Sequence, residues 1–288
     1  MRPRGLQTKI FLDSGDPAET QHALKLLGFL DGQTTNPSLI AKNPQVEARI
    51  KNGKKFMREE INDFYRQVIQ EIRTLIPAGS ISVEVYADSE TKNESMIADA
   101  QKFFVWAPNL HIKLPLSREG LKAMTQATQQ HIQINATLCF NQGQAAAVYN
   151  ATQGAKEGSV YLSPFIGRLD DQMENGMDLI ANILRMYKQG DAHVEVLAAS
   201  VRNYDHFKQC LILGTHIVTC PLRVLEEWAA ESMPISFRNF VYDNRTLKNI
   251  PYQNVNLDDP WQGLNIQHVL TDKGLQKFAD DWNGVLER

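Results

Sequence analysis

Eight short strand candidates, most of them apolar, recur along this chain, with helical stretches between them. They are KIFLDS (9–14), DGQTTN (31–36), ISVEVY (81–86), LHIKLPL (110–116), IQINATL (132–138), SVYLSP (159–164), HVEVLAAS (193–200) and HIVTCP (216–221). Repeated strand–helix units of this kind indicate an α/β fold, a single (β/α)8 TIM barrel, which typically takes ~250 residues. A doubly wound open sheet is the alternative, but no GxGxxG follows the first segment and no Walker sequence occurs.

Capping patterns mark several of the expected helices. DPAE offers Asp16 as an N-cap, Pro17 at the first helical position and Glu19 as the partner of a capping box. Further helices are expected at NPSLIAK and in SREGLKAM, where the helix would begin directly after Ser117. Residues 58–76 carry apolar side chains at helical spacing, which predicts a helix with one core-facing stripe. The stripe consists of Ile61, Phe64, Val68, Ile72 and Leu75.

We expect one domain, with the barrel over residues 1–228 and a C-terminal extension over 229–288 that belongs to the same domain. Residues 229–265 contain the breakers MP, NIP and DDP and are predicted to be irregular. The chain then closes with LTDKGLQKFADDWNGVLER, a predicted terminal helix. The basic stretch 43–57 is interpreted as an added, solvated face.

Composition limits the possible partners. A net charge of -3 and a pI near 6.2 argue against nucleic acid or a membrane as the main partner, so arginines at particular positions must capture any anionic ligand. Cys139, Cys210 and Cys220 stand far apart, which favours neither a zinc site nor a disulfide framework. We expect no cofactor. The absence of a signal-peptide pattern and of a span of ~18 apolar residues favours a cytoplasmic protein.

A lysine in the middle of the apolar segment LHIKLPL needs an explanation. Ile112 and Leu114 flank Lys113, and a buried ammonium must find a partner or give up its proton. Polar side chains at the same phase of other segments would converge with it inside a barrel. They are Asp13, Asn36, Glu84, Asn135, Thr137 and Ser163.

This combination suits Schiff-base carbonyl chemistry, because it joins a lysine and two carboxylates to several hydroxyl and amide groups. Each residue also has an ordinary alternative. Lys113 could be an edge or snorkelling lysine, Asp13 a helix cap or turn residue, and the asparagine and threonine side chains hydrogen-bonded core groups. Because these side chains lie on the same face of their strands, we favour a joint role in one site over separate structural roles.

Two arginines indicate an anion site. Arg168 follows the sixth segment, and Arg202 follows the seventh, beside Ser200. Barrels often bind phosphate on the loops after their last strands, and guanidinium matches a phosphate dianion. The alternative is that Arg168 only pairs with Asp170 or Asp171. Two arginines and a serine together favour phosphate.

Most of the chain resembles the transaldolase family, within the class I Schiff-base aldolase superfamily. The matching motifs, in the family's order, are FLDS, DGQTTNPSLIAKNP, SVEV, HIKLPLSREGLKAM, INATLCFNQGQAAA, YLSPFIGRLDD and AASVRN. The ending LTDKGLQKFADDW is similar to the tail of the short bacterial transaldolases. Residues 43–57 and 229–265 are longer than in those short forms, whose terminal helix packs on a neighbouring subunit. We expect a homo-oligomer.

The resemblance implies a role for each matched residue. Lys113 would form the Schiff base with a ketose C2 carbonyl, for which it needs a pKa well below the ~10.4 of free lysine. Asp13 would take and return the C4 hydroxyl proton. Glu84 and Thr137 would hold a water that moves protons. Contacts to substrate hydroxyls are implied for Asn36, Asn135 and Ser163, and contacts to the terminal phosphate for Arg168, Ser200 and Arg202.

The family contains both transaldolases and fructose 6-phosphate aldolases. Glu84 and Phe165 resemble the transferases, because the aldolases tend to carry Gln and Tyr there. We therefore expect transfer of a dihydroxyacetone unit from fructose 6-phosphate or sedoheptulose 7-phosphate to an aldose phosphate, as in the pentose phosphate pathway. Alternatives are the aldolase, a related sulfonated ketose as substrate, and a non-catalytic sugar-phosphate binding protein.

Overall fold

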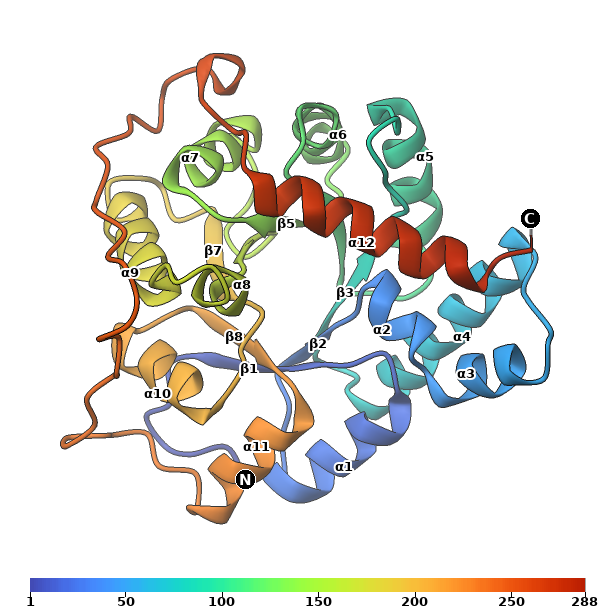
Figure 1. Ribbon diagram of the computed structural model, residues 1–288, viewed down its shortest axis with the longest axis horizontal. Coiled ribbons are helices and arrows are strands. Elements are labelled where there is room, and N and C mark those ends of the chain that lie inside the picture. Colours follow the sequence, from blue (N-terminus) through green and yellow to red (C-terminus); the bar gives the residue numbers. More distant parts are fainter. Residues whose placement is uncertain (288) are drawn as a thin grey trace.

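Eight parallel strands close into a barrel in the computed structural model, which describes residues 1–287 (Figure 1). The strands are β1 (Lys9–Asp13), β2 (Gly32–Thr34), β3 (Ser80–Glu84), β4 (Leu110–Pro115), β5 (Ile134–Cys139), β6 (Val160–Pro164), β7 (Val194–Ala198) and β8 (Ile217–Cys220). Pairing of β1 with β8 closes the sheet. The predicted TIM barrel is confirmed, and no strand extends more than one residue beyond its predicted segment.

Helices follow the strands, and most of them cover the outer face of the barrel (Figure 1). They are α1 (Pro17–Leu27), α2 (Pro37–Ala41), α3 (Pro44–Lys51), α4 (Arg58–Leu75), α5 (Asn93–Phe104), α6 (Arg118–Gln129), α7 (Gln142–Ala151), α8 (Ile166–Asp170), α9 (Gly176–Tyr187), α10 (Tyr204–Leu213), α11 (Leu222–Ala230), the 3-10 turn η1 (Trp261–Gly263) and α12 (Val269–Val285). None of these helices is long and apolar enough to cross a membrane.

The predicted caps are present, but the capping box is wrong. Asp16 accepts a hydrogen bond from the Ala18 N–H at 2.9 Å, and Ser117 caps α6 in the same manner. Glu19 does not reach back to the Asp16 N–H, because the Ser14 hydroxyl accepts that N–H at 3.1 Å and donates its own proton to Glu19.

The helix α4 begins at Arg58 as predicted and ends one residue early, at Leu75, and part of its predicted buried stripe is corrected. Phe64 and Leu75 are only half-buried, whereas Tyr65 and Ile69 are buried. The buried face is therefore rotated by one residue at these positions. This rotation brings the Tyr65 hydroxyl to the strands β2 and β3.

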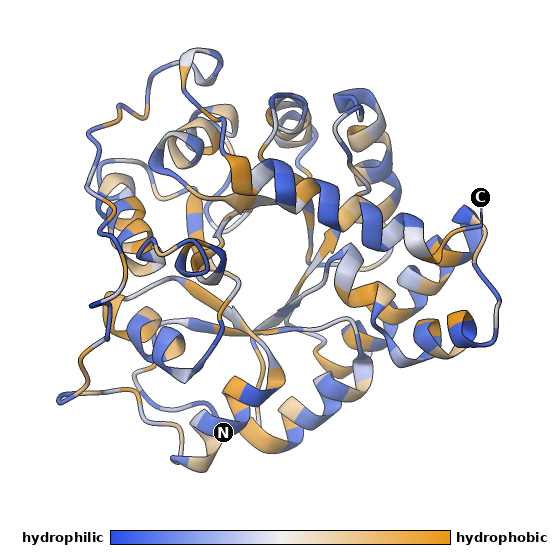
Figure 2. Ribbon diagram, viewed as in Figure 1, coloured by the Kyte–Doolittle hydropathy of each residue, from blue (hydrophilic) through white to orange (hydrophobic). Residues whose placement is uncertain are grey.

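The hydrophobic core lies between the strands and the helices. Outward-facing strand residues such as Ile10, Leu114 and Leu162 are fully buried. In Figure 2 the apolar sides of several helices turn toward the barrel and their hydrophilic sides face outward. The opposite phase of the strands points into the barrel and carries the polar residues predicted for the site. Burial of the apolar strand side chains against the helices thus turns the alternate, polar side chains into the barrel.

Residues 231–260 contain no helix or strand, which confirms most of the predicted irregular segment 229–265. Its ends differ from the prediction, because 229–230 belong to α11 and 261–263 form η1. The segment runs past α9 and α7 (Figure 1) and is held by hydrogen bonds. The Asn175 N–H donates to the Lys248 carbonyl at 2.9 Å, and the Asn182 amide donates to the Ile250 carbonyl at 2.8 Å.

The predicted terminal helix is confirmed as α12, which crosses the mouth of the barrel (Figure 1). At its start the Thr271 hydroxyl donates to the Leu138 carbonyl at 3.0 Å. Leu138 has a φ of 66°, at an irregularity in the β5–β6 register that turns this carbonyl toward α12. Near its end Asp281 accepts a hydrogen bond from Ser38 of α2.

The basic stretch 43–57 is only partly solvated, so that interpretation is corrected. Val46 and Phe56 are buried. Arg49 stacks over the Phe56 ring at 4.0 Å, and residues 285–287 pair with Phe56. The Phe56 N–H donates to the Val285 carbonyl, and the Glu287 N–H donates to the Phe56 carbonyl, both at 2.9 Å. The stretch therefore holds the end of α12.

Candidate active site

A cavity of about 360 Å³ opens at the C-terminal ends of the strands, and we call it the main cavity. Eight of the eleven predicted site residues line it. They are Asp13, Asn36, Lys113, Ser163, Phe165, Arg168, Ser200 and Arg202. The other three, Glu84, Asn135 and Thr137, are buried in the strands beside it. The strand phase therefore brings the predicted residues into one region.

Lys113 points into the barrel from β4 and is 3% exposed. Its Nζ lies 3.0 Å from Oε2 of Glu84 and donates to the Thr35 carbonyl at 3.1 Å. The β3–β4 register aligns Glu84 with Lys113, which explains why the two side chains meet. The buried lysine has therefore found a carboxylate partner while still facing a cavity.

Both carboxyl groups near Lys113 have raised pKa values. Burial raises the pKa of Asp13, although the Lys113 charge and a 2.7 Å hydrogen bond from the Thr34 hydroxyl oppose it. Burial also raises the pKa of Glu84 against the effect of Lys113. The negative charge of Asp13 adds to the rise at Glu84. Two carboxyl groups with raised pKa beside one lysine form an arrangement suited to proton transfer.

Amide and hydroxyl groups connect the floor of the barrel. Ser163 donates to Oδ1 of Asn135 at 2.7 Å, and Nδ2 of Asn135 donates to Ser82 at 2.9 Å. Thr137 is fully buried, and its hydroxyl has no hydrogen-bond partner among residues 1–287. Asn36 caps α2 by accepting from the Leu39 N–H at 2.9 Å, which leaves its Nδ2 free to face the main cavity.

The two arginines differ in their surroundings. Arg168 lies between the rings of Phe165 and Phe278, at 5.2 and 5.4 Å from their centroids. The alternative pairing of Arg168 with Asp170 or Asp171 is not found, because His206 binds Asp170 at 2.8 Å and Arg202 binds Asp171 at 2.6 Å. Burial, and then the charge of Arg202, lower the pKa of Arg168.

Comparison with known proteins identifies the family. The profile of the family described as transaldolase/fructose-6-phosphate aldolase matches residues 10–288. The chain belongs to this transaldolase/aldolase family. A probable transaldolase from Anaeromyxobacter sp. (strain Fw109-5) is 36% identical over 280 residues, which are 97% of this chain and 100% of that protein. A probable transaldolase from Caulobacter sp. (strain K31) is 37% identical, over 96% of this chain and 97% of that protein.

Solved structures of other enzymes are only distantly similar. The 3-hexulose-6-phosphate synthase from Salmonella typhimurium has a TM-score of 0.48 and 11% identity, over 78% of this chain and 99% of that one. The family assignment of this transaldolase-type chain rests on the sequence comparisons. Among its described residues, no group of three or more His, Cys, Asp or Glu side chains is placed to hold a metal ion.

Sequence reasoning missed Tyr65, which supports the site of this family member from outside the barrel. Its hydroxyl accepts the Glu84 N–H at 3.1 Å and donates to the Thr35 hydroxyl, which donates in turn to the Ser82 carbonyl. Glu84 and the Thr35 carbonyl are the two partners of Lys113. Tyr65 therefore holds both groups that orient the lysine.

Replacing Tyr65 by phenylalanine is expected to reduce stability by about 1–3 kcal/mol, because the Glu84 N–H would be buried without a partner. Chemical denaturation measures this loss. Tyr252→Phe is the matched control, since the Tyr252 hydroxyl makes no hydrogen bond to another described residue, and it should leave stability nearly unchanged. Equal stability of the two variants would contradict the role given to the Tyr65 hydroxyl.

Proposed function

We propose that this protein is a transaldolase that transfers a dihydroxyacetone unit from a ketose phosphate to an aldose phosphate through a Schiff base on Lys113. The observation that carries the proposal is the buried Lys113, which faces the main cavity and has Glu84 3.0 Å from its Nζ. Fructose 6-phosphate or sedoheptulose 7-phosphate would be the donor. The family assignment supports this class of reaction.

Schiff-base formation needs a neutral amine and a route for protons. In the proposed first step Glu84 accepts a proton from Lys113, and the amine attacks the C2 carbonyl of the ketose. The resulting carbinolamine loses its C2 oxygen as water and becomes an iminium. Glu84 and the unpartnered Thr137 hydroxyl would hold the water that moves protons in this step, which fits the raised pKa of Glu84.

Carbon–carbon cleavage follows from the same arrangement. The Asp13 carboxylate takes the proton of the C4 hydroxyl while the C3–C4 bond breaks, and the electron pair moves to the iminium nitrogen. An aldose phosphate leaves, and an enamine stays on Lys113. The enamine then attacks the aldehyde carbon of the acceptor, and Asp13 returns its proton to the new hydroxyl. Water finally cleaves the iminium and releases the product ketose.

The donor's terminal anion would bind at Arg168, Ser200 and Arg202. Arg168 supports this assignment because no carboxylate of a described residue lies within 4 Å of its guanidinium. The aromatic rings on both sides would hold the guanidinium toward the main cavity. Guanidinium also binds sulfonate, so a sulfonated ketose is the competing substrate, and parallel assays with both ketoses distinguish them.

Borohydride reduction with fructose 6-phosphate, followed by peptide mass mapping, tests the proposal. We expect a reduced sugar adduct on Lys113, and we expect that erythrose 4-phosphate added before reduction lowers its yield. Binding of fructose 6-phosphate without an adduct on any lysine would instead support a non-catalytic sugar-phosphate binding protein.

The aldolase is the second candidate, since the family contains both activities. A buried phenyl ring at Phe165 favours the transferase, because it offers no hydroxyl to place a water that protonates the enamine. Phe165→Tyr is therefore expected to increase the release of free dihydroxyacetone several-fold when no acceptor is present. Release at the same rate in the wild-type protein and the variant would count against this distinction.

Gly274 of α12 allows the helix to pass close to Arg168. A Cβ at this position would lie 2.5 Å from Nη1 of Arg168 and 2.6 Å from a methyl group of Leu138. Gly274→Ala is therefore expected to displace the guanidinium and raise the KM for fructose 6-phosphate by ~10-fold, with kcat less affected. The control is Gly284→Ala on the same helix, which meets nothing within 4 Å and should leave the KM unchanged.

A further inference from the structure

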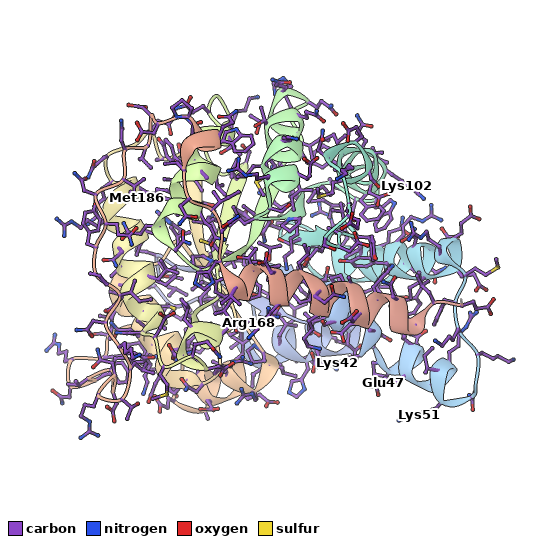
Figure 3. All side chains as sticks on the ribbon, turned by 45° about the horizontal axis from the view of Figure 1, so that its top comes forward. Lys42, Glu47, Lys51, Lys102, Arg168 and Met186 are labelled. Carbon is purple, nitrogen blue, oxygen red and sulfur yellow. The ribbon has the colours of Figure 1, made fainter. Side chains whose placement is uncertain are left out.

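A second, smaller cavity, which we call the rear cavity, reaches Glu84 one helical turn further along α12 than the main cavity. Phe278 of α12 lines the main cavity, whereas Trp282 of the same helix lines this rear cavity. The rear cavity lies between α4, α5 and β3 and measures about 40 Å³. Figure 3 shows Lys42, beside the main cavity, on one side of α12 and Lys102 of α5 on the other. The two cavities therefore meet α12 at successive turns of one face and share no lining residue.

Polar side chains follow the rear cavity from the surface to the site. Arg58 is exposed, Asn62 and Asp99 are half-buried, and Tyr65 and Glu84 are buried. A space of about 40 Å³ can hold water, because a single molecule needs only ~10–15 Å³ and two to four polar partners. These side chains offer such partners along the whole path.

Glu84 has unused capacity for hydrogen bonds. Its side chain is buried and Oε2 lies 3.0 Å from Lys113, but no described residue gives this oxygen a hydrogen bond of good geometry. An ionised carboxylate can accept about four hydrogen bonds. Glu84 lines the rear cavity, whereas Lys113 lines the main cavity. The carboxyl group thus stands between the lysine and a polar space that the sugar does not need to enter.

This inference rests on the proposed Schiff-base reaction, which releases one water when the iminium forms and consumes one when it is hydrolysed. During both steps the sugar occupies the main cavity, where Lys113 binds its C2. We propose that water enters and leaves at Glu84 through the rear cavity, lined by Asn62, Tyr65 and Asp99. Arg58 marks its outer end.

The oxygen atom of C2 reports on this route. When the carbinolamine collapses, the C2–O bond breaks and the oxygen leaves as water, and hydrolysis forms a new C2–O bond with a different water. A ketose incubated in H2¹⁸O therefore gains ¹⁸O at C2 each time the released water escapes before it returns. The ratio of ¹⁸O exchange to iminium formation measures this escape, and a general loss of activity does not change the ratio.

Asn62→Leu is the variant that obstructs the route. The Asn62 side chain makes no hydrogen bond to another described residue, so leucine removes its polarity without breaking a contact with the protein. We expect the ratio of ¹⁸O exchange into fructose 6-phosphate to iminium formation to fall at least ~3-fold. Asn62→Asp keeps a polar group of the same size at this position and should therefore keep the wild-type ratio of ¹⁸O exchange to iminium formation. Asp63→Leu, on the exposed side of α4, is the matched control and should not change it.

An unchanged ratio in Asn62→Leu would show that water uses the main cavity and would overturn the inference. Failure of the wild-type protein to form an iminium would overturn the proposed function instead. A high-resolution crystal structure is an independent test of the route. We expect an ordered water within hydrogen-bond distance of the Glu84 carboxyl group in the wild-type protein and none in Asn62→Leu. A dry rear cavity in the wild-type crystal would contradict the route.

Discussion

Replacing Lys113 by methionine is expected to lower transaldolase turnover at least ~10⁴-fold, the scale of loss when a covalent nucleophile is removed. Methionine fills a similar volume but cannot attack a carbonyl, so borohydride should trap no adduct at any position. A coupled assay with fructose 6-phosphate and erythrose 4-phosphate measures the turnover. Lys122→Met is the matched control, because Lys122 is an exposed lysine that pairs with Glu119 on α6. Residual turnover within ~10-fold of wild type would disprove the role of Lys113.

The same variant should also be less stable, and this effect can be separated from catalysis. Removing one partner of a buried ion pair costs about 3–5 kcal/mol, because the other charge is left alone. Without Lys113, the pKa of Glu84 would rise further, since Lys113 is the largest influence that lowers it. Glu84→Gln added to Lys113→Met should recover most of the stability and none of the activity. If Lys113→Met alone is as stable as the wild type, the desolvation cost of the Lys113–Glu84 ion pair equals the stabilisation that the pair provides.

Much of the barrel could be predicted because the decisive signals are local. Most of the strands show alternating apolar residues, although DGQTTN (31–36) does not, and closing the barrel turns the opposite phase inward. This is why Asp13, Lys113 and Ser163 were predicted to face a common space and do so. The caps at Asp16 and Ser117 could be predicted for the same reason, because each side chain bonds to an N–H only two or three residues further along the chain. The capping box failed because Ser14, outside the motif, competes for the Asp16 N–H.

The parts of the site that sequence could not predict depend on contacts between distant segments. Phe64 and Tyr65 are adjacent aromatic residues on α4, and helical spacing alone cannot tell which is buried, since both lie within the width of one apolar face. The two rings around Arg168 come from Phe165 and from Phe278 on α12, so the second requires the path of α12 across the barrel. The rear cavity likewise exists only where α12 passes.

Replacing Asp13 by asparagine is expected to lower turnover by ~10²–10⁴-fold and to raise the melting temperature. Catalysis falls because asparagine cannot accept the C4 hydroxyl proton. Stability rises because burial raises the pKa of Asp13 above its ordinary 3.8, so keeping this carboxyl group ionised at neutral pH works against folding. Asparagine still accepts the Thr34 hydroxyl, and Lys113 keeps Glu84 as its partner. For a domain of about 150–250 residues, a gain of 1 kcal/mol in the free energy of unfolding raises the melting temperature by about 2–4 °C.

The sign of this effect is tested by its dependence on pH. The penalty from Asp13 is absent below the pKa of the unfolded chain, near 3.8, and is complete above the raised pKa of the folded state. The stability advantage of Asp13→Asn should therefore be largest near pH 7 and disappear as the pH falls toward 4. Asp16→Asn is the control, because asparagine caps a helix as well as aspartate, and it should change neither activity nor melting temperature. A lower melting temperature for Asp13→Asn at pH 7 would mean that Lys113 and Thr34 outweigh burial at this carboxyl group. Asp13 would then be held ionised by its neighbours, and the site would carry no penalty in stability for the proposed base of C3–C4 cleavage.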